Sequence, residues 1–309
     1  MDKSPHKSGF INVNGVRLHY LDWGGSGDVI LFLAGMGCNA HIFDNLAPRF
    51  TDRFHVMALT RRGHGQSDQP ETGYDIDTLI EDIRQFMDVT GVEKAILVGH
   101  SMAHIELSHF TALWPGRVLK LVFLDAAYDR TSDSFKNMLE KNPLIKMQKP
   151  DQDKAYYTIE DYFASIKRDY PALAAIWGDL MQEHSLHEIT QTTEGKVIDK
   201  MSDATDAALN KTMSTYVPED SKIRNPALGI FAVSNGCYYI AADWMTAEQK
   251  AQVWEFFEKV DDPWIMENIH QFQQNIPQAQ VVVIPQGHHY CFIKEEELVY
   301  HEMRNFLIE

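Results

Sequence analysis

The feature that most constrains the fold of this chain is a series of short hydrophobic runs spread along its length. They are rich in Val, Ile, Leu and Phe, and several contain hardly any polar residue. Strands with this pattern are usually covered on both faces, as they are in a parallel sheet. The segments between the runs show helical patterns, and this alternation predicts a parallel sheet flanked by helices. The runs are VILFLAG (29–35), HVMALT (55–60), AILVGH (95–100), LKLVFLDA (119–126), ALGIFAV (227–233) and AQVVVIP (279–285).

Local signals around these runs agree with that architecture. Residues 10–22 predict a hairpin, because Asn14 and Gly15 near its middle tolerate the positive φ angles of a tight turn. Apolar residues at helical spacing and amphipathic patterns predict further elements between and after the strands. The predicted helices are residues 77–90, 102–113 and 295–308.

Residues 130–222 have a different character. They are rich in Asp, Glu, Lys, Gln and Met, contain no strong strand pattern and indicate several helices. A long insertion of this kind usually carries function or a lid. We therefore expect a core of residues 1–129 and 223–309, with an inserted helical cap of residues 130–222.

Composition narrows the class of partner. The chain has 309 residues and a formal net charge of -16, whereas proteins that bind nucleic acid normally present a basic face. Its three cysteines form no C-x-x-C pair, which favours free thiols in a reducing compartment. The first residues lack the apolar segment of a signal peptide, and no run approaches the ~18 apolar residues of a membrane span. We expect a cytoplasmic protein with a small-molecule substrate, no nucleic-acid partner and no membrane span, as a monomer or a homodimer.

The strongest chemical signal is the segment Gly99-His100-Ser101-Met102-Ala103. It nearly matches G-x-S-x-G, the sharp turn that presents a nucleophilic serine between a buried strand and a helix. Small flanking residues let the strand and helix pack closely while the strained turn projects the hydroxyl. The last position holds Ala103 instead of Gly, and a methyl group is the smallest departure. We predict Ser101 as the catalytic nucleophile.

His104 follows this turn and is unusual there. Its simplest interpretation is a polar side chain that packs beside the first helical turn and bonds to a neighbouring loop. Two functional interpretations stay open: a second base near Ser101, or a metal ligand together with His100. Isolated histidines on helices seldom bind metals, so no metal site is predicted.

A serine hydroxyl is a poor nucleophile at neutral pH until a base takes its proton. The segment QGHHYCF follows the last predicted strand and precedes the last helix, so its loop can reach back to Ser101. It offers two candidates, His288 and His289. Only one imidazole can face the serine hydroxyl, so one of the two has another role.

A third group must orient that imidazole and stabilise its charged form. Asp125 ends the strand that follows the nucleophile helix, at the expected edge of the sheet. The end of the next strand carries Asn235, which can hold an imidazole but lends no charge. We therefore predict Asp125 as the acid, with Asp129 and Asp243 in reserve.

The reaction also needs donors for the oxyanion that develops on the substrate. The backbone N–H of Met102, directly after the nucleophile, is one candidate. The turn Ala34-Gly35-Met36-Gly37 after the first buried strand is the natural source of the other, because its glycines let the backbone approach a substrate. We predict the N–H of Met36 for this role.

These segments resemble the α/β-hydrolase superfamily, and the resemblance covers nearly the whole chain. It is carried by VILFLAGMGCNAHIFDNLAPRF, MALTRRGHGQSDQP, LVGHSMA, WPGRVLKLVFLDAA and QGHHYCF. The resemblance implies an α/β fold with a mostly parallel central sheet, a helical cap and no cofactor. It favours His289 over His288, because the family's catalytic histidine is commonly followed by an aromatic residue, which is Tyr290 here.

The chain departs from the family pattern in three places. The family's acid usually follows the strand before Asn235, although some members place it one strand earlier, which is Asp125 here. Ala34 stands where a histidine usually braces the oxyanion loop, so we expect this loop to be held differently. His104 replaces a residue that is usually small.

The sequence therefore predicts a serine hydrolase that cleaves carboxylic esters through an acyl-enzyme. Ser101 attacks, His289 transfers the proton, Asp125 orients His289, and the N–H groups of Met36 and Met102 hold the oxyanion. Family members with an Asp nucleophile, such as haloalkane dehalogenases and epoxide hydrolases, are disfavoured. Two alternatives stay open: a C–C hydrolase or amidase with the same triad, and a hydrolase-derived receptor with slow turnover, suggested by the three departures.

Overall fold

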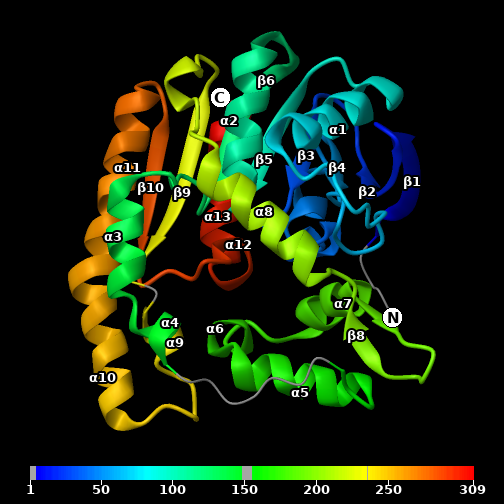
Figure 1. The fold of residues 1–309 in the computed structure, drawn as a ribbon. Helices are drawn as coiled ribbons and strands as arrows, with labels where there is room; N and C mark the ends of the chain where they lie inside the picture. Colours follow the sequence, from blue (N-terminus) through cyan, green and yellow to red (C-terminus); the bar gives the residue numbers. More distant parts are fainter. Residues whose placement is uncertain (1–4, 148–154, 235) are drawn as a thin grey trace.

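The centre of the computed structural model, which describes residues 5–147, 155–234 and 236–309, is an eight-stranded sheet (Figure 1). The strands lie in the order β1-β2-β4-β3-β5-β6-β9-β10. Their bounds are β1 (Lys7–Val13), β2 (Val16–Gly24), β3 (Val29–Leu33), β4 (His55–Leu59), β5 (Ala95–His100), β6 (Val118–Leu124), β9 (Ala227–Val233) and β10 (Gln280–Pro285).

The pairing of these strands confirms the predicted mostly parallel sheet. From β4 through β3, β5, β6 and β9 to β10, every neighbouring pair is parallel. These six strands are the six hydrophobic runs of the sequence. The hairpin of β1 and β2 is antiparallel and turns at Asn14 and Gly15, whose φ angles are 47° and 77°. Both residues adopt the left-handed region that such a turn requires.

Alternate residues of the buried strands enter two different cores, because successive side chains point to opposite faces of a sheet. In β3, Leu31 and Leu33 belong to one core and Ile30 and Phe32 to the other. The first core includes helices α1 (Ile76–Val89), α2 (Ala103–Leu113) and α11 (Asp262–Asn275), and the second includes α12 (Cys291–Lys294), α13 (Glu296–Ile308) and the 3-10 turns η1 (Ala40–Phe43) and η2 (Ala47–Phe50). The predicted helices 77–90, 102–113 and 295–308 correspond to α1, α2 and α13.

The chain between β6 and β9 forms a mostly helical insertion. Figure 1 shows α5, α6 and α7 beyond one end of the sheet. Its helices are α3 (Asp133–Lys141), α4 (Pro143–Lys146), α5 (Ile159–Asp169), α6 (Pro171–Ala174), α7 (Asp179–Glu188) and α8 (Asp203–Thr215), followed by the turn η4 (Asp220–Lys222). The sequence shows no strong strand pattern here, and among the described residues the structure adds only a short hairpin of β7 (Ile189–Gln191) and β8 (Val197–Asp199). Strands of three residues are too short to show a period, and Gly195 at φ 80° closes the turn.

A second helical excursion follows β9, where the sequence analysis assigned no element. It consists of α9 (Gly236–Tyr239), α10 (Ala247–Phe256) and a π-helical turn (Phe257–Asp261), which runs directly into α11. Helix α10 contacts α4 of the first insertion. Residues beyond 130–222 therefore also cover this end of the sheet. Across the described residues, no helix has both the length and the apolar character needed to cross a membrane.

Candidate active site

Ser101 lies in a sharp turn between β5 and α2. Its φ angle is 53°, in the left-handed region that residues other than glycine rarely adopt. A Cβ atom at Gly99 would lie 3.0 Å from the Cβ of Ala103 and 2.8 Å from the Leu107 side chain. The strand and helix can therefore pack this closely only because position 99 has no side chain. Ala103 is tolerated at the last position of the motif because its methyl group occupies the space that Gly99 leaves.

Asp125 follows β6, one strand along from Ser101, and its carboxylate is held on both sides. Its Oδ2 atom lies 2.6 Å from Nδ1 of His289. Its Oδ1 atom accepts hydrogen bonds from the Tyr128 hydroxyl at 2.6 Å and from the Ala232 N–H at 3.0 Å. Asp125 is buried, and a low dielectric strengthens these interactions. The structure thus brings Asp125 and His289 together, whereas Asn235 lies outside the described residues.

The two adjacent histidines after β10 have different partners. His288 accepts a hydrogen bond from the N–H of Tyr290 at Nδ1, so its Nε2 carries the proton and donates to the Ala172 carbonyl at 2.9 Å. Burial lowers the pKa of His288 to about 4, so it is neutral at pH 7. The Nε2 atom of His100 lies 3.1 Å from the backbone oxygen of His289. These contacts hold the loop in place, and the His289 ring forms its hydrogen bond with Asp125.

Ser101, Asp125 and His289 all line one cavity of about 270 Å³. Most of the other lining side chains are aromatic or aliphatic, which suits an apolar group of a substrate. They are Tyr128, Phe135, Met138, Leu144, Met213, Tyr239, Phe256, Phe257, Trp264 and Ile265. A larger cavity of about 900 Å³ shares Leu144, Tyr239 and His289 with the first and is lined mainly by the insertion between β6 and β9.

The loop after β3 lies against Ser101. A Cβ atom at Gly35 would lie 3.0 Å from the Ser101 Cβ and 2.8 Å from the Nδ1 atom of His100, so only glycine allows this approach. Met36 lines the larger cavity and Met102 the smaller one. Within the described part of the chain, neither the Met36 N–H nor the Met102 N–H donates a hydrogen bond. Both N–H groups are therefore without a hydrogen-bond acceptor among the described residues, and each belongs to a residue that lines one of the two cavities.

Arg61 holds this loop, in which Ala34 provides no bracing side chain. Its Nη2 atom donates to the Ala34 carbonyl at 2.8 Å, and its Nη1 atom donates to the Gly35 carbonyl at 3.4 Å. The same guanidinium forms two hydrogen bonds with Glu106 of α2, the shorter at 2.5 Å. Both charged side chains are buried. Arg61 thus ties the loop to the helix that begins after Ser101.

His104 lies on α2 and lines the smaller cavity. Its Nε2 atom is 3.0 Å and 2.9 Å from the two carboxylate oxygens of Asp220, and both side chains are buried. Burial raises the pKa of Asp220, but the charge and hydrogen bond of His104 outweigh it, so this pKa lies below its ordinary value. His104 is therefore bonded to a neighbouring segment. His100 bonds to a different group, the His289 carbonyl, so the two rings share no hydrogen-bond partner among the described residues.

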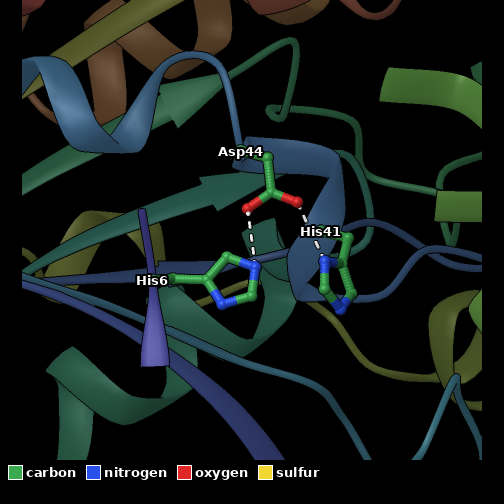
Figure 2. Close-up of side chains that lie close together, drawn as sticks. All are labelled: His6, His41 and Asp44. Atoms are coloured by element: carbon green, nitrogen blue, oxygen red, sulfur yellow. Dashed lines mark hydrogen bonds and ion pairs between the residues drawn. The ribbon is translucent and has the colours of Figure 1, made fainter. Parts of the chain in front are cut away.

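Three other donor atoms lie close together near the N-terminal strands (Figure 2). The Nε2 atom of His6 is 3.5 Å from Oδ1 of Asp44, and the Nδ1 atom of His41 is 2.8 Å from Oδ2 of Asp44. Nitrogen and carboxylate donors of this kind can bind a divalent cation such as Zn²⁺, and these atoms lie within 4.8 Å of one another. None of the three residues lines the cavity that contains Ser101. Asp44 lies between the two imidazole rings and contacts both.

Several side chains of the site were not predicted from the sequence. Tyr128 and Arg130 follow Asp125 closely in DAAYDR, and this proximity is the only sequence signal for them. Asp261 lines the same cavity from the π-helical turn, for which the sequence shows no pattern. Arg61 stands in the Arg-Arg pair of TRRGHG, whose second member binds the buried Asp82 instead.

A family model described as the alpha/beta hydrolase fold matches residues 28–296. The chain belongs to the alpha/beta hydrolase family. Among similar proteins, this alpha/beta hydrolase is 39% identical to a 2-(acetamidomethylene)succinate hydrolase of Mesorhizobium japonicum over 101 residues. This matched segment covers 33% of this chain and 36% of that protein. It is also 36% identical to a non-heme chloroperoxidase of Streptomyces lividans over 116 residues. This segment covers 37% of this chain and 42% of that protein. The matched segments span well under half of these relatives.

Solved structures resemble the alpha/beta hydrolase over almost its whole length. The crystal structure of E-2-(acetamidomethylene)succinate hydrolase has a TM-score of 0.75 and 22% identity, covering 98% of this chain and 100% of that chain. A marine microorganism esterase has a TM-score of 0.65 and 21% identity, covering 94% of this chain and 98% of that chain. At identities this low, the structural similarity concerns the fold alone. It confirms the predicted fold.

Proposed function

We propose that this alpha/beta hydrolase cleaves carboxylic esters of small molecules through an acyl-enzyme on Ser101. The observation that carries the proposal is the hydrogen bond between Asp125 and His289, at 2.6 Å, on the wall of the cavity that also contains Ser101. A buried carboxylate, an imidazole and a serine on a strained turn are the three parts of a nucleophilic triad.

In the first half of the reaction, His289 takes the Ser101 proton at Nε2 while the serine oxygen attacks the ester carbonyl. Asp125 accepts the Nδ1–H of His289 and stabilises the imidazolium that forms. The N–H groups of Met36 and Met102 hold the oxyanion, and each such donor is worth about 3 kcal/mol in the transition state. His289 then returns its proton to the departing alkoxide, which leaves as the alcohol.

In the second half, His289 takes a proton from water, and the resulting hydroxide attacks the acyl carbonyl. The tetrahedral intermediate collapses, Ser101 regains its proton from His289, and the carboxylic acid leaves. We assign residues 130–222 the role of a cap that shapes the acyl and alcohol pockets. The named activities of relatives include a bifunctional esterase/perhydrolase of Acinetobacter calcoaceticus, which is consistent with ester chemistry. The free cysteines suit a reducing compartment such as the cytoplasm.

The experiment that tests this function is to trap the acyl-enzyme. With 4-nitrophenyl acetate, we expect a burst of 4-nitrophenol and, after rapid quenching, a peptide containing Ser101 that is heavier by one acetyl group. A fluorophosphonate probe is expected to label the same residue, and Ser101→Ala is the unlabelled control. Turnover of the ester with no label at Ser101 contradicts the proposal. Faster turnover of a matched anilide or β-diketone shifts the assignment to an amidase or a C–C hydrolase.

A further prediction concerns Arg61, which positions the oxyanion loop. Lysine at this position keeps a positive charge but loses the planar fork that reaches two carbonyls and Glu106 at once. We expect Arg61→Lys to lower kcat about 10–100-fold with little change in KM, because a displaced donor weakens binding of the transition state more than of the ester. Steady-state kinetics at a temperature where the variant is folded measure this. An unchanged kcat shows that the loop keeps its position without Arg61.

A further inference from the structure

Arg130 lines the cavity that contains Ser101, and no described residue pairs with its charge. It lies in the segment between β6 and α3 and lines the same cavity as Ser101 and His289. Its guanidinium carbon is 5.8 Å from the centre of the Phe135 ring, which also lines the cavity. Across the described residues, the Arg130 side chain forms no hydrogen bond and no ion pair. By contrast, the buried Arg62 holds both oxygens of Asp82.

An unpaired guanidinium at this place is costly. Burial lowers the pKa of Arg130, which means that the surrounding protein disfavours its charge. Proteins normally compensate a charge that has lost water with an opposite charge or with hydrogen bonds. Among the described residues, no ion pair and no hydrogen bond compensates the charge of Arg130, so a ligand that enters the cavity can form these interactions.

The carboxylates of the cavity do not neutralise Arg130. Asp125 is committed to His289 and Tyr128. Asp261 lines the cavity but forms no ion pair with Arg130, and burial followed by the charges of Asp262 and Asp125 raises its pKa to about 7. Below that pH most of Asp261 is uncharged, so the positive charge of Arg130 remains available.

An anionic group of the ligand satisfies these conditions. The guanidinium is planar and offers parallel N–H donors that match the two oxygens of a carboxylate. Much of the remaining wall is aromatic and aliphatic, with residues such as Phe135, Met138 and Trp264, which suits a short methylene chain between that carboxylate and the reacting carbonyl. A carboxylate is preferred to a bulkier oxyanion because the cavity holds only about 270 Å³.

We propose that Arg130 forms the anion-binding end of the acyl pocket and that the substrates are half-esters of short dicarboxylic acids. The inference rests on the proposed ester hydrolysis and deepens it. One carbonyl of the diacid reaches Ser101 as the ester, and the other end binds Arg130 as a free carboxylate. The alcohol leaves on the opposite side of the carbonyl.

The test compares substrates that differ only in the carboxylate. Monomethyl glutarate and methyl valerate have acyl chains of equal length, as do monomethyl adipate and methyl hexanoate, and methanol release measures turnover. We expect wild-type kcat/KM to favour the half-ester at one of these lengths. Arg130→Gln is expected to lower that ratio about 10–100-fold, the worth of a charge-assisted hydrogen-bond pair, while turnover of the neutral ester changes little. Arg130→Lys is expected to keep part of the preference.

The control is Arg53→Gln, which removes an exposed arginine far along the chain from the site and should leave the ratio unchanged. If Arg130→Gln lowers both esters equally, or if wild type shows no preference, the anion-binding role is overturned while ester hydrolysis stands. If no ester is turned over, calorimetric titration of glutarate and adipate into Ser101→Ala decides separately. Binding that disappears in the Ser101→Ala, Arg130→Gln double variant supports the pocket, and absence of binding overturns it.

Discussion

Replacing Ser101 by alanine is expected to lower kcat/KM for 4-nitrophenyl acetate by about 10⁴-fold or more. The variant loses the oxygen that forms the covalent bond, and what remains is the smaller rate enhancement from the oxyanion donors and substrate binding. Alanine and serine have the same backbone requirements, so the φ angle of 53° is no more strained than before. We therefore expect a change in unfolding free energy of less than about 1 kcal/mol.

A variant that combines Ser101→Ala with His289→Ala tests whether the two side chains act as one unit. Residues that act as one unit have strongly non-additive effects on rate. His289→Ala alone should cost nearly as much as Ser101→Ala, and the combination should be little worse than either. If the losses multiply instead, the two side chains act independently and do not form a nucleophile–base pair. Thermal unfolding of each variant separates loss of activity from loss of fold.

Replacing Asp125 by asparagine is expected to lower kcat about 10⁴-fold at pH 7. The reason lies in how the carboxylate is held. Its Oδ1 atom accepts from the Tyr128 hydroxyl and the Ala232 N–H, so the amide oxygen of an asparagine would take that place. The NH₂ group then faces Nδ1 of His289, which must become an acceptor. The proton moves to Nε2, and the ring cannot accept a proton from Ser101.

Tyr128→Phe is the matched control for this variant. It removes one of the two donors to Oδ1 but leaves the carboxylate and its bond to His289. We expect a loss of only a few-fold in kcat, since one hydrogen bond to a charged group is worth about 1.5–3 kcal/mol and part of that is shared by the ground state. Equal losses in Asp125→Asn and Tyr128→Phe contradict the tautomer argument. Both are measured as kcat for the same ester.

The sequence predicted the sheet well because its strands are buried on both faces. A run such as AILVGH has no polar side to confuse its assignment, and it became β5 without change of bounds. The hairpin β7–β8 and the helices α10 and α11 were not predicted. The hairpin is too short to show a period, and the π-helical turn between the two helices interrupts the regular spacing of apolar residues.

The prediction of site residues depended on where each strand ends. Asp125 and the loop with His288 and His289 were chosen because the carboxyl ends of parallel strands meet at one edge, and the family resemblance favoured His289. The structure places Asp125 and His289 in contact. Arg61 and Arg130 could not be chosen this way. Arg61 acts on backbone carbonyls, which have no residue signature, and Arg130 is notable because it forms no ion pair or hydrogen bond among the described residues. Contacts of this kind exist only after the chain has folded.

The two helical excursions described above leave the sheet after neighbouring strands, β6 and β9, and both supply walls to the cavity of Ser101. Grafting only the segment between β6 and β9 from another hydrolase would therefore replace only part of the cavity wall. The grafted segment would have to pack against Tyr239, Phe257 and Trp264, which belong to the unchanged excursion after β9. Transfer of substrate preference between such hydrolases calls for exchanging both segments together.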